Sequence, residues 1–335
     1  MGHENSDVLI VVPTLNEERH IERCIRSLLG NDPTMRHAML IVADGGSTDR
    51  TCAIVQGVAR DFDNVTLLHN PDRLQSAAVN LAIEKHALQH HKYLVRCDAH
   101  SVYPANYVAK VVEALRAKDV ASVTTVMDAV FDTCFAKGAA WIVDTKLGSG
   151  GSAHRGGITS RYVDHGHHAG MRIDWFRKVG GYDPTFAVNE DAEYDHRLVQ
   201  TGGKIWLAAD IRMKYFMRSS PTALLRQYFR YGRGRARTVL KHRILPRPRQ
   251  MLPVINLILL CLTIPLGLLN PVFLVWPVAY GSLLVFASIW MGAKHKEVCG
   301  LWSGPALAII HLGWAAGFIR EALGRRDRGP VSRAI

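Results

Sequence analysis

The last quarter of the chain limits its fold most strongly, because the sequence is almost continuously apolar from Met251 onward. A helix needs roughly 20 apolar residues to cross a bilayer, and the runs in this region approach that length. Asn270 and Pro271 separate the first two runs and indicate a tight hairpin. We therefore predict a membrane region over 251–335 with two or three transmembrane segments. The candidate segments are 252–269, 272–291 and 298–319, the last interrupted by a proline, a histidine and several glycines.

The chain before this region has a different pattern. Up to about Phe216, short apolar runs alternate with helical patterns, which predicts a soluble α/β domain over 1–218. Residues 219–250 carry many arginines among leucines and aromatic residues, a pattern that predicts a basic amphipathic connector on an anionic membrane surface. The formal net charge of +12 requires an acidic partner. Nucleic acid is the competing partner for the connector, but the apolar segments that follow it favour a membrane.

Short apolar runs in the α/β domain end in polar residues. Ligands of open α/β sheets bind at the carboxyl ends of the strands, so we expect these residues at one site. Asp98 and His100 could share one Mn²⁺ or Mg²⁺ ion, because carboxylate and imidazole are suitable ligands. The alternative is that Asp98 caps the helix that begins near Pro104. The runs end in Pro13 and Thr14, in Asp44, and in Asp98.

Arg73 stands at the mouth of a helix predicted from about Gln75 to His86. There it could meet a diphosphate, or it could be a solvated turn residue. Asn80, inside this helix, is expected to form internal hydrogen bonds rather than to bind a ligand.

The segment from Asp128 to His168 shows no regular pattern. Its glycine-rich part, 148–157, could be a loop that closes over a ligand or a plain surface insertion. The histidines at its end could form an acceptor site, support the structure or bind a metal. This cluster consists of His165, His167 and His168.

The six cysteines show no paired spacing. Neither a disulfide framework nor a zinc site is therefore expected, and a reducing compartment fits best.

Several motifs in order resemble those of family 2 glycosyltransferases of the GT-A fold. Among these enzymes, the sequence is most similar to the membrane-associated glucosyltransferases of succinoglycan biosynthesis. The resemblance extends from about Val8 to Tyr231, and it implies a Rossmann-like, mostly parallel sheet. Its motifs are Pro13 to Glu17, Asp44 to Asp49, the strand ending in Asp98, Gly180 to Asp183, Asn189 to Asp191, and Gln227 to Tyr231.

The resemblance implies an inverting transfer of a hexose, glucose by analogy, from a UDP-sugar to a lipid-linked saccharide in exopolysaccharide synthesis. Asp191 would be the catalytic base, and Asp98 would hold the ribose or a divalent cation, Mn²⁺ or Mg²⁺. His100 stands where the family usually has a second aspartate, and it would be the second metal ligand or would form a hydrogen bond to the donor sugar or to a loop. We also expect His167, His168 and Glu190 to be acceptor residues. The implied donor-binding residues are Pro13, Thr14, Asn16, Glu17, Asp44, Arg73, Asp98, Gln227, Arg230 and Tyr231.

Glu190 and Asp191 also open a helical pattern that continues to Gly202 and Gly203. In the first turn of a helix, the helix dipole favours the ionised form of a carboxylate, as a base requires. An ordinary acidic helix start would have the same sequence, and only the place of this pair among the family motifs favours catalysis.

Three other functions remain open. A processive polysaccharide synthase would share the motif at Gln227 to Tyr231 but would be expected to have more membrane spans. A nucleotidyltransferase would be expected to carry a glycine-rich, lysine-containing phosphate loop, which the segment after Val12 lacks. An inactive sugar-binding protein would be expected to lose the base.

Basic residues predict the orientation in the membrane. Basic residues near membrane segments favour the cytoplasmic side, and both the connector and Lys294 to Lys296 are basic. We therefore expect a catalytic domain on the cytoplasmic side of a bacterial plasma membrane. A third full crossing would place the arginines after Ile319 outside, against the same rule. We therefore leave the side of the C-terminus open.

Overall fold

The protein is described by a computed structural model, which covers residues 6–30, 32–152, 155 and 157–324. The arginines at 325, 326 and 328, which bear on the membrane orientation, lie outside these residues. The described chain forms two compact units: the first combines residues up to 129 with 152–216, and the second combines 130–151 with residues from 217 onward.

The first unit is built on one sheet of nine strands within the described residues, in the order β3-β2-β1-β4-β8-β6-β9-β5, with β7 paired to β9. The pairs among β1, β2, β3 and β4 are parallel, whereas β4–β8, β6–β8, β5–β9 and β7–β9 are antiparallel. The expected parallel arrangement therefore holds for the first half of a mixed sheet. The strands are β1 (Val8–Thr14), β2 (Met39–Asp44), β3 (Val65–His69), β4 (Tyr93–Arg96), β5 (Ser101–Val102), β6 (Ser122–Val130), β7 (Arg161–Val163), β8 (His168–Arg172) and β9 (Ile205–Phe216).

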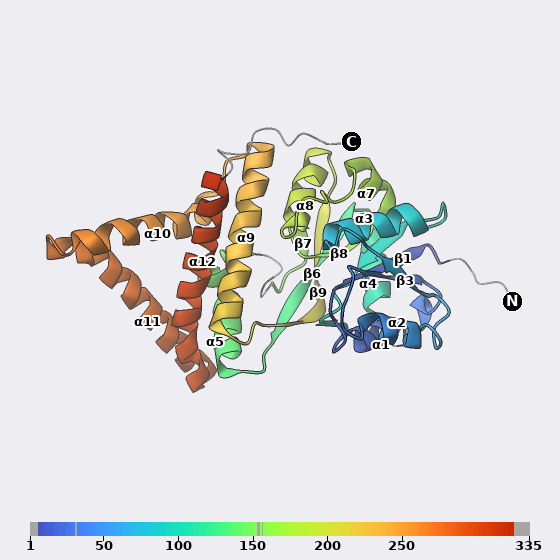
Figure 1. Cartoon of the computed structure of the whole chain (residues 1–335), viewed down its shortest axis with the longest axis horizontal. Coiled ribbons are helices and arrows are strands. Elements are labelled where there is room, and N and C mark those ends of the chain that lie inside the picture. Colours follow the sequence, from blue (N-terminus) through green and yellow to red (C-terminus); the bar gives the residue numbers. More distant parts are fainter. Residues whose placement is uncertain (1–5, 31, 153–154, 156, 325–335) are drawn as a thin grey trace. The chain divides into compact units, whose positions relative to one another are not determined.

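Helices cover both faces of this sheet (Figure 1). One face shares a buried core with α3, α7 and α8, which contribute residues such as Val79, Phe176 and Tyr194. On the other face, the Cβ of any residue replacing Gly170 in β8 would meet Val111 of α4 at 2.4 Å, so glycine lets helix and strand approach. The helices are α1 (Ile21–Leu29), η1 (Pro33–Met35), α2 (Thr51–Val58), α3 (Gln75–His86), α4 (Tyr107–Lys118), α7 (Ile173–Val179) and α8 (Glu190–Gln200).

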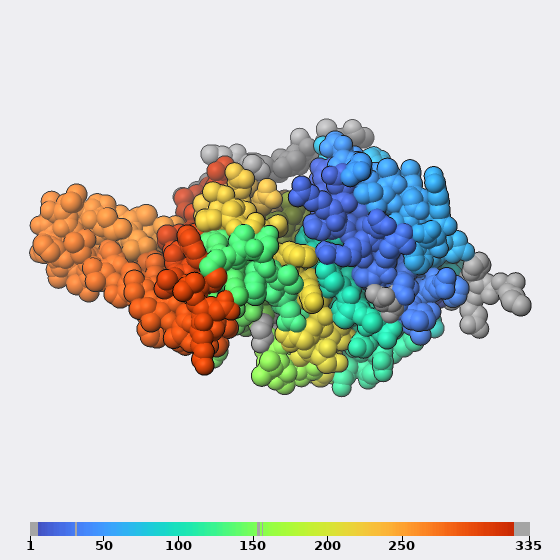
Figure 2. Space-filling model, turned by 90° about the horizontal axis from the view of Figure 1, so that it is seen from below, coloured from blue at the N-terminus to red at the C-terminus, as the bar shows by residue number. Residues whose placement is uncertain are grey.

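The second unit is helical throughout its described part. Three of its helical segments are long and apolar enough to cross a membrane: Pro248–Leu266, Pro271–His295 and Val298–Gly324. Figure 2 shows the orange segment of α10 and α11, whose apolar side chains are largely exposed, as at Leu262 and Val278. Its elements are α5 (Cys134–Val143), α6 (Lys146–Ser149), α9 (Pro221–His242), α10 (Pro248–Leu266), η2 (Pro271–Leu274), α11 (Val275–His295), η3 (Val298–Trp302) and α12 (Ser303–Gly324).

Two expectations from the sequence are wrong in this unit. The segment from Asp128 to His168 was expected to be irregular, yet it contains the ten-residue helix α5, which the Thr133 side chain caps by accepting from the Ala136 N–H. The cysteines were expected to be unpaired, yet Cys134 on α5 forms a disulfide with Cys299 in η3. The two residues are 165 positions apart, so only the fold brings them together.

Helices α9 and α12 run parallel and in close contact. Leu225 lies against Gly313, Phe229 against Gly317, and Arg233 pairs with Glu321 at 2.9 Å, so each step of four residues along α9 matches one along α12. Small residues on both helices allow the backbones to approach, as in the small-xxx-small pairs of membrane helices. The apolar side of the predicted connector helix thus packs on α12. The buried positions of α9 are Leu224, Gly232, Gly234, Ala236 and Thr238.

We predict that Gly317→Ala destabilises the protein by about 1–3 kcal/mol, the usual cost of overpacking. The added Cβ would lie 2.0 Å from the carbonyl oxygen of Phe229 and would push α9 away from α12. Gly281→Ala in α11 is the matched control, because no atom lies within 4 Å of its added Cβ. The control should be neutral or slightly stabilising, since alanine is the better helix former. Thermal unfolding of the detergent-purified chain measures both, and equal shifts would contradict the proposed contact.

Candidate active site

A cavity of about 160 Å³ opens at the carboxyl ends of β1 and β4. The sheet order reverses between these two strands, and this is the usual ligand position in open α/β sheets. The cavity wall brings together five of the predicted donor residues and the predicted metal ligand His100. Its lining residues are Pro13, Thr14, Leu15, Glu17, Ala43, Asn70, Arg73, Leu74, Gln75, Ala78, Asp98, Ala99 and His100.

The segment after β1 is tied to the loop after β2. The Asn16 N–H donates to Ser47 Oγ at 2.8 Å, and Asn16 Oδ1 accepts from the Thr48 N–H at 2.8 Å. The Glu17 N–H donates to Thr51 Oγ1, also at 2.8 Å. These bonds hold Asn16 at a φ of +57°, which asparagine tolerates better than most residues. The first two motifs therefore form one rigid edge of the cavity.

Asp44 is buried within its own turn. Its carboxylate accepts the N–H groups of Gly46 and Ser47, at 2.8 and 2.9 Å, and the Ser47 hydroxyl. Burial alone would raise the pKa of Asp44, but these hydrogen bonds outweigh it and lower the pKa. At Gly45, a Cβ would lie 3.2 Å from the Cα of Arg73. The glycine thus brings the Asp44 turn against Arg73, as the predicted donor site requires.

Arg96, the last residue of β4, is the buried charge at the centre of the site. Its Nη1 lies 3.2 Å from Glu190 Oε1 and 3.4 Å from the Tyr182 hydroxyl, and its Nη2 lies 3.5 Å from Asp98 Oδ1. Burial alone would lower the pKa of Arg96, but the nearby negative charges raise it. One guanidinium thereby connects Asp98 beside the cavity to Glu190 at the start of α8. The sequence analysis did not identify this residue.

The carboxylate of Asp98 stays ionised although it is partly buried. Burial would raise its pKa, but the nearby groups, above all the charge of Arg96, lower the pKa to about 2. The side chain of Gln75 donates to Asp98 Oδ1 at 3.0 Å, and Nε2 of His167 lies 3.5 Å from Oδ2. Asp98 is therefore held as an acceptor of hydrogen bonds or as a ligand.

His100 contacts Glu17, with 3.0 Å between Nδ1 and Oε1. Over residues 6–324, apart from the gaps given above, no group of three or more His, Cys, Asp or Glu side chains is arranged to hold a metal ion. An ionised Asp98 beside the neutral His167 nevertheless fits a divalent cation that takes its other ligands from a diphosphate and water.

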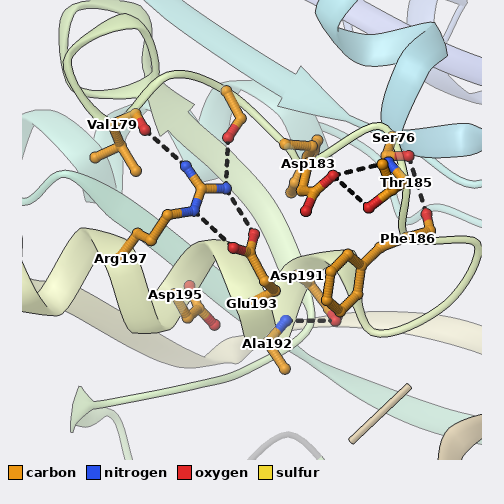
Figure 3. A network of polar contacts seen from close by, with 12 residues as sticks. Ser76, Val179, Asp183, Thr185, Phe186, Asp191, Ala192, Glu193, Asp195 and Arg197 are labelled. Carbon is orange, nitrogen blue, oxygen red and sulfur yellow. Dashed lines mark hydrogen bonds and ion pairs between the residues drawn. The ribbon is translucent and has the colours of Figure 1, made fainter. Parts of the chain in front are cut away.

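The start of α8 is fixed by a network around Arg197 (Figure 3). Arg197 donates to the carbonyl oxygens of Val179 and Gly181, at 2.6 and 2.8 Å, and pairs with Glu193 at 2.7 Å. The Asp191 carboxylate accepts from the Ala192 N–H at 2.8 Å. Helix α8 is thus anchored to the turn that precedes it, with Asp191 in its first turn.

The same turn is bound to α3. Asn80 accepts from the Tyr182 N–H at 2.9 Å and donates to the Tyr182 carbonyl oxygen at 2.7 Å, which agrees with the internal role expected for it. Ser76 donates to the carbonyl oxygen of Phe186 at 3.0 Å, as Figure 3 shows. The Gly180 to Asp183 motif therefore positions α8.

His168 lies inside the unit with no exposed side-chain surface. Its Nε2 contacts Asp195 Oδ1 and its Nδ1 contacts the Tyr182 hydroxyl, both at 2.6 Å. His165 contacts the other oxygen of Asp195 at 2.8 Å. Among the described contacts of the predicted acceptor histidines, only that of His167 is with a cavity residue, Asp98. We therefore give His168 a supporting role.

Gln227, Arg230 and Tyr231 lie on α9 in the second unit. The Gln227 side chain donates to the Tyr231 hydroxyl at 3.1 Å, across one helical turn, and Arg230 is exposed. Their roles toward the donor stay predictions.

Four residues of the site were missed: Gln75, Arg96, Tyr182 and Asp195. A signal existed only for Arg96, because an arginine inside a buried apolar strand requires a counter-charge.

The family model for glycosyl transferase family 2 matches residues 9–180. The chain also matches the succinoglycan biosynthesis protein ExoA of Rhizobium meliloti (strain 1021), with 41% identity over 338 aligned residues and 96% of each chain covered. This chain belongs to glycosyltransferase family 2. The resemblance inferred from the motifs is thereby confirmed.

A more distant relative is a glucuronosyltransferase of Methanococcus voltae named for a dolichyl N-acetyl-alpha-D-glucosaminyl phosphate. It is 24% identical over 244 residues, which cover 70% of this chain and 74% of the relative.

Solved structures confirm the GT-A fold. The mannosyltransferase PcManGT of Pyrobaculum calidifontis, solved in complex with GDP-Man and Mn²⁺, superposes with a TM-score of 0.61 at 18% identity, covering 95% of this chain and 87% of that one. GalNAc-T7, solved with UDP, GalNAc and Mn²⁺, gives a TM-score of 0.51 at 16% identity and covers 64% and 44%.

We predict that His167→Gln makes the protein less sensitive to acid. Burial lowers the pKa of His167 to about 4, outweighing the opposite effect of Asp98, while an unfolded histidine has a pKa of about 6.5. Between these values the unfolded state binds a proton and the folded state does not, so stability falls as the pH decreases from about 6.5 to 4.

The measurement is the unfolding temperature against pH, without added divalent cation. The wild type should lose stability over this window more steeply than His167→Gln. His69→Gln, which changes an exposed histidine, should follow the wild type. Parallel curves for all three proteins would show that His167 does not titrate in this way.

Proposed function

We propose that this family 2 glycosyltransferase moves a hexose, glucose by the resemblance of its motifs, from a UDP-sugar to a lipid-linked saccharide with inversion at the anomeric carbon. The observation that carries the proposal is the Arg96 contact, which joins the ionised Asp98 of the cavity to the acidic start of α8. The 41% identity to a succinoglycan biosynthesis protein supports a role in exopolysaccharide synthesis.

The cavity supplies the donor site in this proposal. Asp44 would accept hydrogen bonds from the uridine, and Arg73 would face the diphosphate with a fork of N–H donors. Pro13, Thr14, Asn16 and Glu17 form the opposite edge. The GDP-Man and UDP bound in the two similar solved structures support such a site.

A divalent cation would be held by Asp98 with His100 or His167. It would neutralise negative charge that develops on the leaving UDP. The Mn²⁺ in both similar structures supports this assignment.

Asp191 serves as the base. As the acceptor oxygen bonds to the anomeric carbon, the bond from that carbon to UDP breaks and the hydroxyl proton moves to Asp191. Glu190 is less suitable because it is 6% exposed and ion-paired with Arg96. Burial outweighs that pairing and raises the pKa of Glu190. His167 and Glu190 would border the acceptor.

The second unit anchors the enzyme in a bacterial plasma membrane, with the catalytic domain over 1–218 on the cytoplasmic side and residues 219–250 at the surface. Its three apolar helices support this anchoring. The test of the whole proposal is to incubate membranes containing the protein with a panel of radiolabelled nucleotide sugars and Mn²⁺. UDP-glucose should label the lipid extract, and no labelling from any donor would refute the proposal.

Asp191→Asn should lower turnover by roughly 10²–10⁴-fold, as expected for the loss of general-base assistance, while donor binding is retained. Turnover is measured with saturating donor, and binding is measured by displacement of labelled UDP. Glu190→Gln is the matched neighbour, and it should affect stability through Arg96 more than it affects proton transfer. If Glu190→Gln abolishes turnover and Asp191→Asn does not, Glu190 is the base.

Removal of divalent cations should abolish transfer, and Mn²⁺ or Mg²⁺ should restore it. Asp98→Asn should raise the cation concentration needed for half-maximal activity, because it removes the charged ligand. Asp132→Asn is a control that changes an exposed aspartate outside the cavity lining. Full activity of the wild type in excess chelator would contradict a metal-assisted reaction.

A further inference from the structure

Two arginines from different helices come together in the second unit. Arg235 of α9 donates through Nη2 to the Gln250 side chain of α10 at 3.3 Å. Arg249, the neighbour of Gln250, donates through Nη1 to the carbonyl oxygen of Gly150 at 2.8 Å. Three parts of the chain, α9, the start of α10 and the turn after α6, therefore hold these two guanidinium groups in place.

This arginine pair, Arg235 and Arg249, has no counter-charge within the described part of the chain. No described carboxylate lies within ion-pair distance of either residue, whereas Arg233 on the same helix pairs with Glu321 at 2.9 Å. The Nε of Arg235 is buried without a hydrogen-bond partner. Burial and the charge of Arg249 both lower the pKa of Arg235. Because the two positive charges repel each other, an anion bound beside them would stabilise both.

The position of the pair indicates where the anion comes from. Arg249 is the second residue of α10, and α10 is the first of the three helices long and apolar enough to cross a membrane. A residue at the end of such a helix lies at the depth of the lipid head groups. Arginine forks match the geometry of phosphate oxygens.

We propose that Arg235 and Arg249 bind the phosphate group of a membrane lipid. The phosphate is that of the lipid carrier that bears the acceptor saccharide. In this respect the inference rests on the proposed function, and it assigns the carrier's phosphate to the second unit. A phospholipid head group offers the same chemistry, and the experiment separates the two sources.

The test uses the full chain in nanodiscs of phosphatidylcholine, to which either polyprenyl phosphate or phosphatidylglycerol is added, without nucleotide sugar. Binding is followed by native mass spectrometry of the lipids retained. The double variant Arg235→Gln with Arg249→Gln should retain about tenfold less polyprenyl phosphate or even less, since charged hydrogen bonds are lost at both residues. Arg226→Gln combined with Arg243→Gln is the control, which removes the same charge from exposed sites on and just after α9 and should retain the lipid within about twofold.

Arg249→Gln alone covers the case in which the double variant does not fold, because Arg249 is exposed. It should show a several-fold loss. If the arginine variants lose phosphatidylglycerol but retain polyprenyl phosphate, the site binds phosphate, but from a phospholipid and not from the carrier. Equal loss in the control pair, or no loss in the arginine pair, would overturn the proposal. Because no sugar donor is present, failure of the transfer reaction would leave this result unaffected.

Discussion

The buried guanidinium of Arg96 holds the candidate active site together, because two carboxylates from distant parts of the chain depend on it. Asp98 follows β4, and Glu190 starts α8; each would be a buried charge without the arginine. Removing one partner of a buried ion pair leaves an uncompensated charge. This loses far more stability than replacing the whole pair by apolar residues. Tyr182 extends the contact to His168 and Asp195. The cavity and the start of α8 are therefore joined by one electrostatic connection.

The sequence predicted much of this unit because its strands are short apolar runs that end in functional residues. Val8–Thr14 and Met39–Asp44 end at the residues expected from the sequence, Thr14 and Asp44, where two of the family motifs lie. The Arg96 contact could not be predicted, since pairing depends on how β4 and α8 meet in space. The antiparallel half of the sheet was missed for the same reason: apolar periodicity does not state which strand lies beside which.

In the second unit, glycine misled the sequence analysis. Glycines in 298–319 were taken to weaken a membrane segment, because glycine lowers helix propensity. In the structure, Gly313 and Gly317 are where α12 touches α9, so the same residues strengthen the packing of the helix they were expected to interrupt. Helix α5 was missed because its partners, such as Trp302, lie far along the chain.

The position of α5 also determines the order in which the protein can assemble during synthesis. The strands and helices of the first unit are all synthesised once Phe216 has emerged. Helix α5 is made earlier than β8 and β9, but its partners are made last. Cys134 pairs with Cys299, and the carbonyl oxygen of Gly138 accepts a hydrogen bond from Ser303 at 2.9 Å. The nascent chain therefore carries an unburied apolar helix until almost its last segment is made. A chain whose synthesis stops before η3 would contain the complete first unit, but its helix α5 would stay exposed to chaperones and proteases.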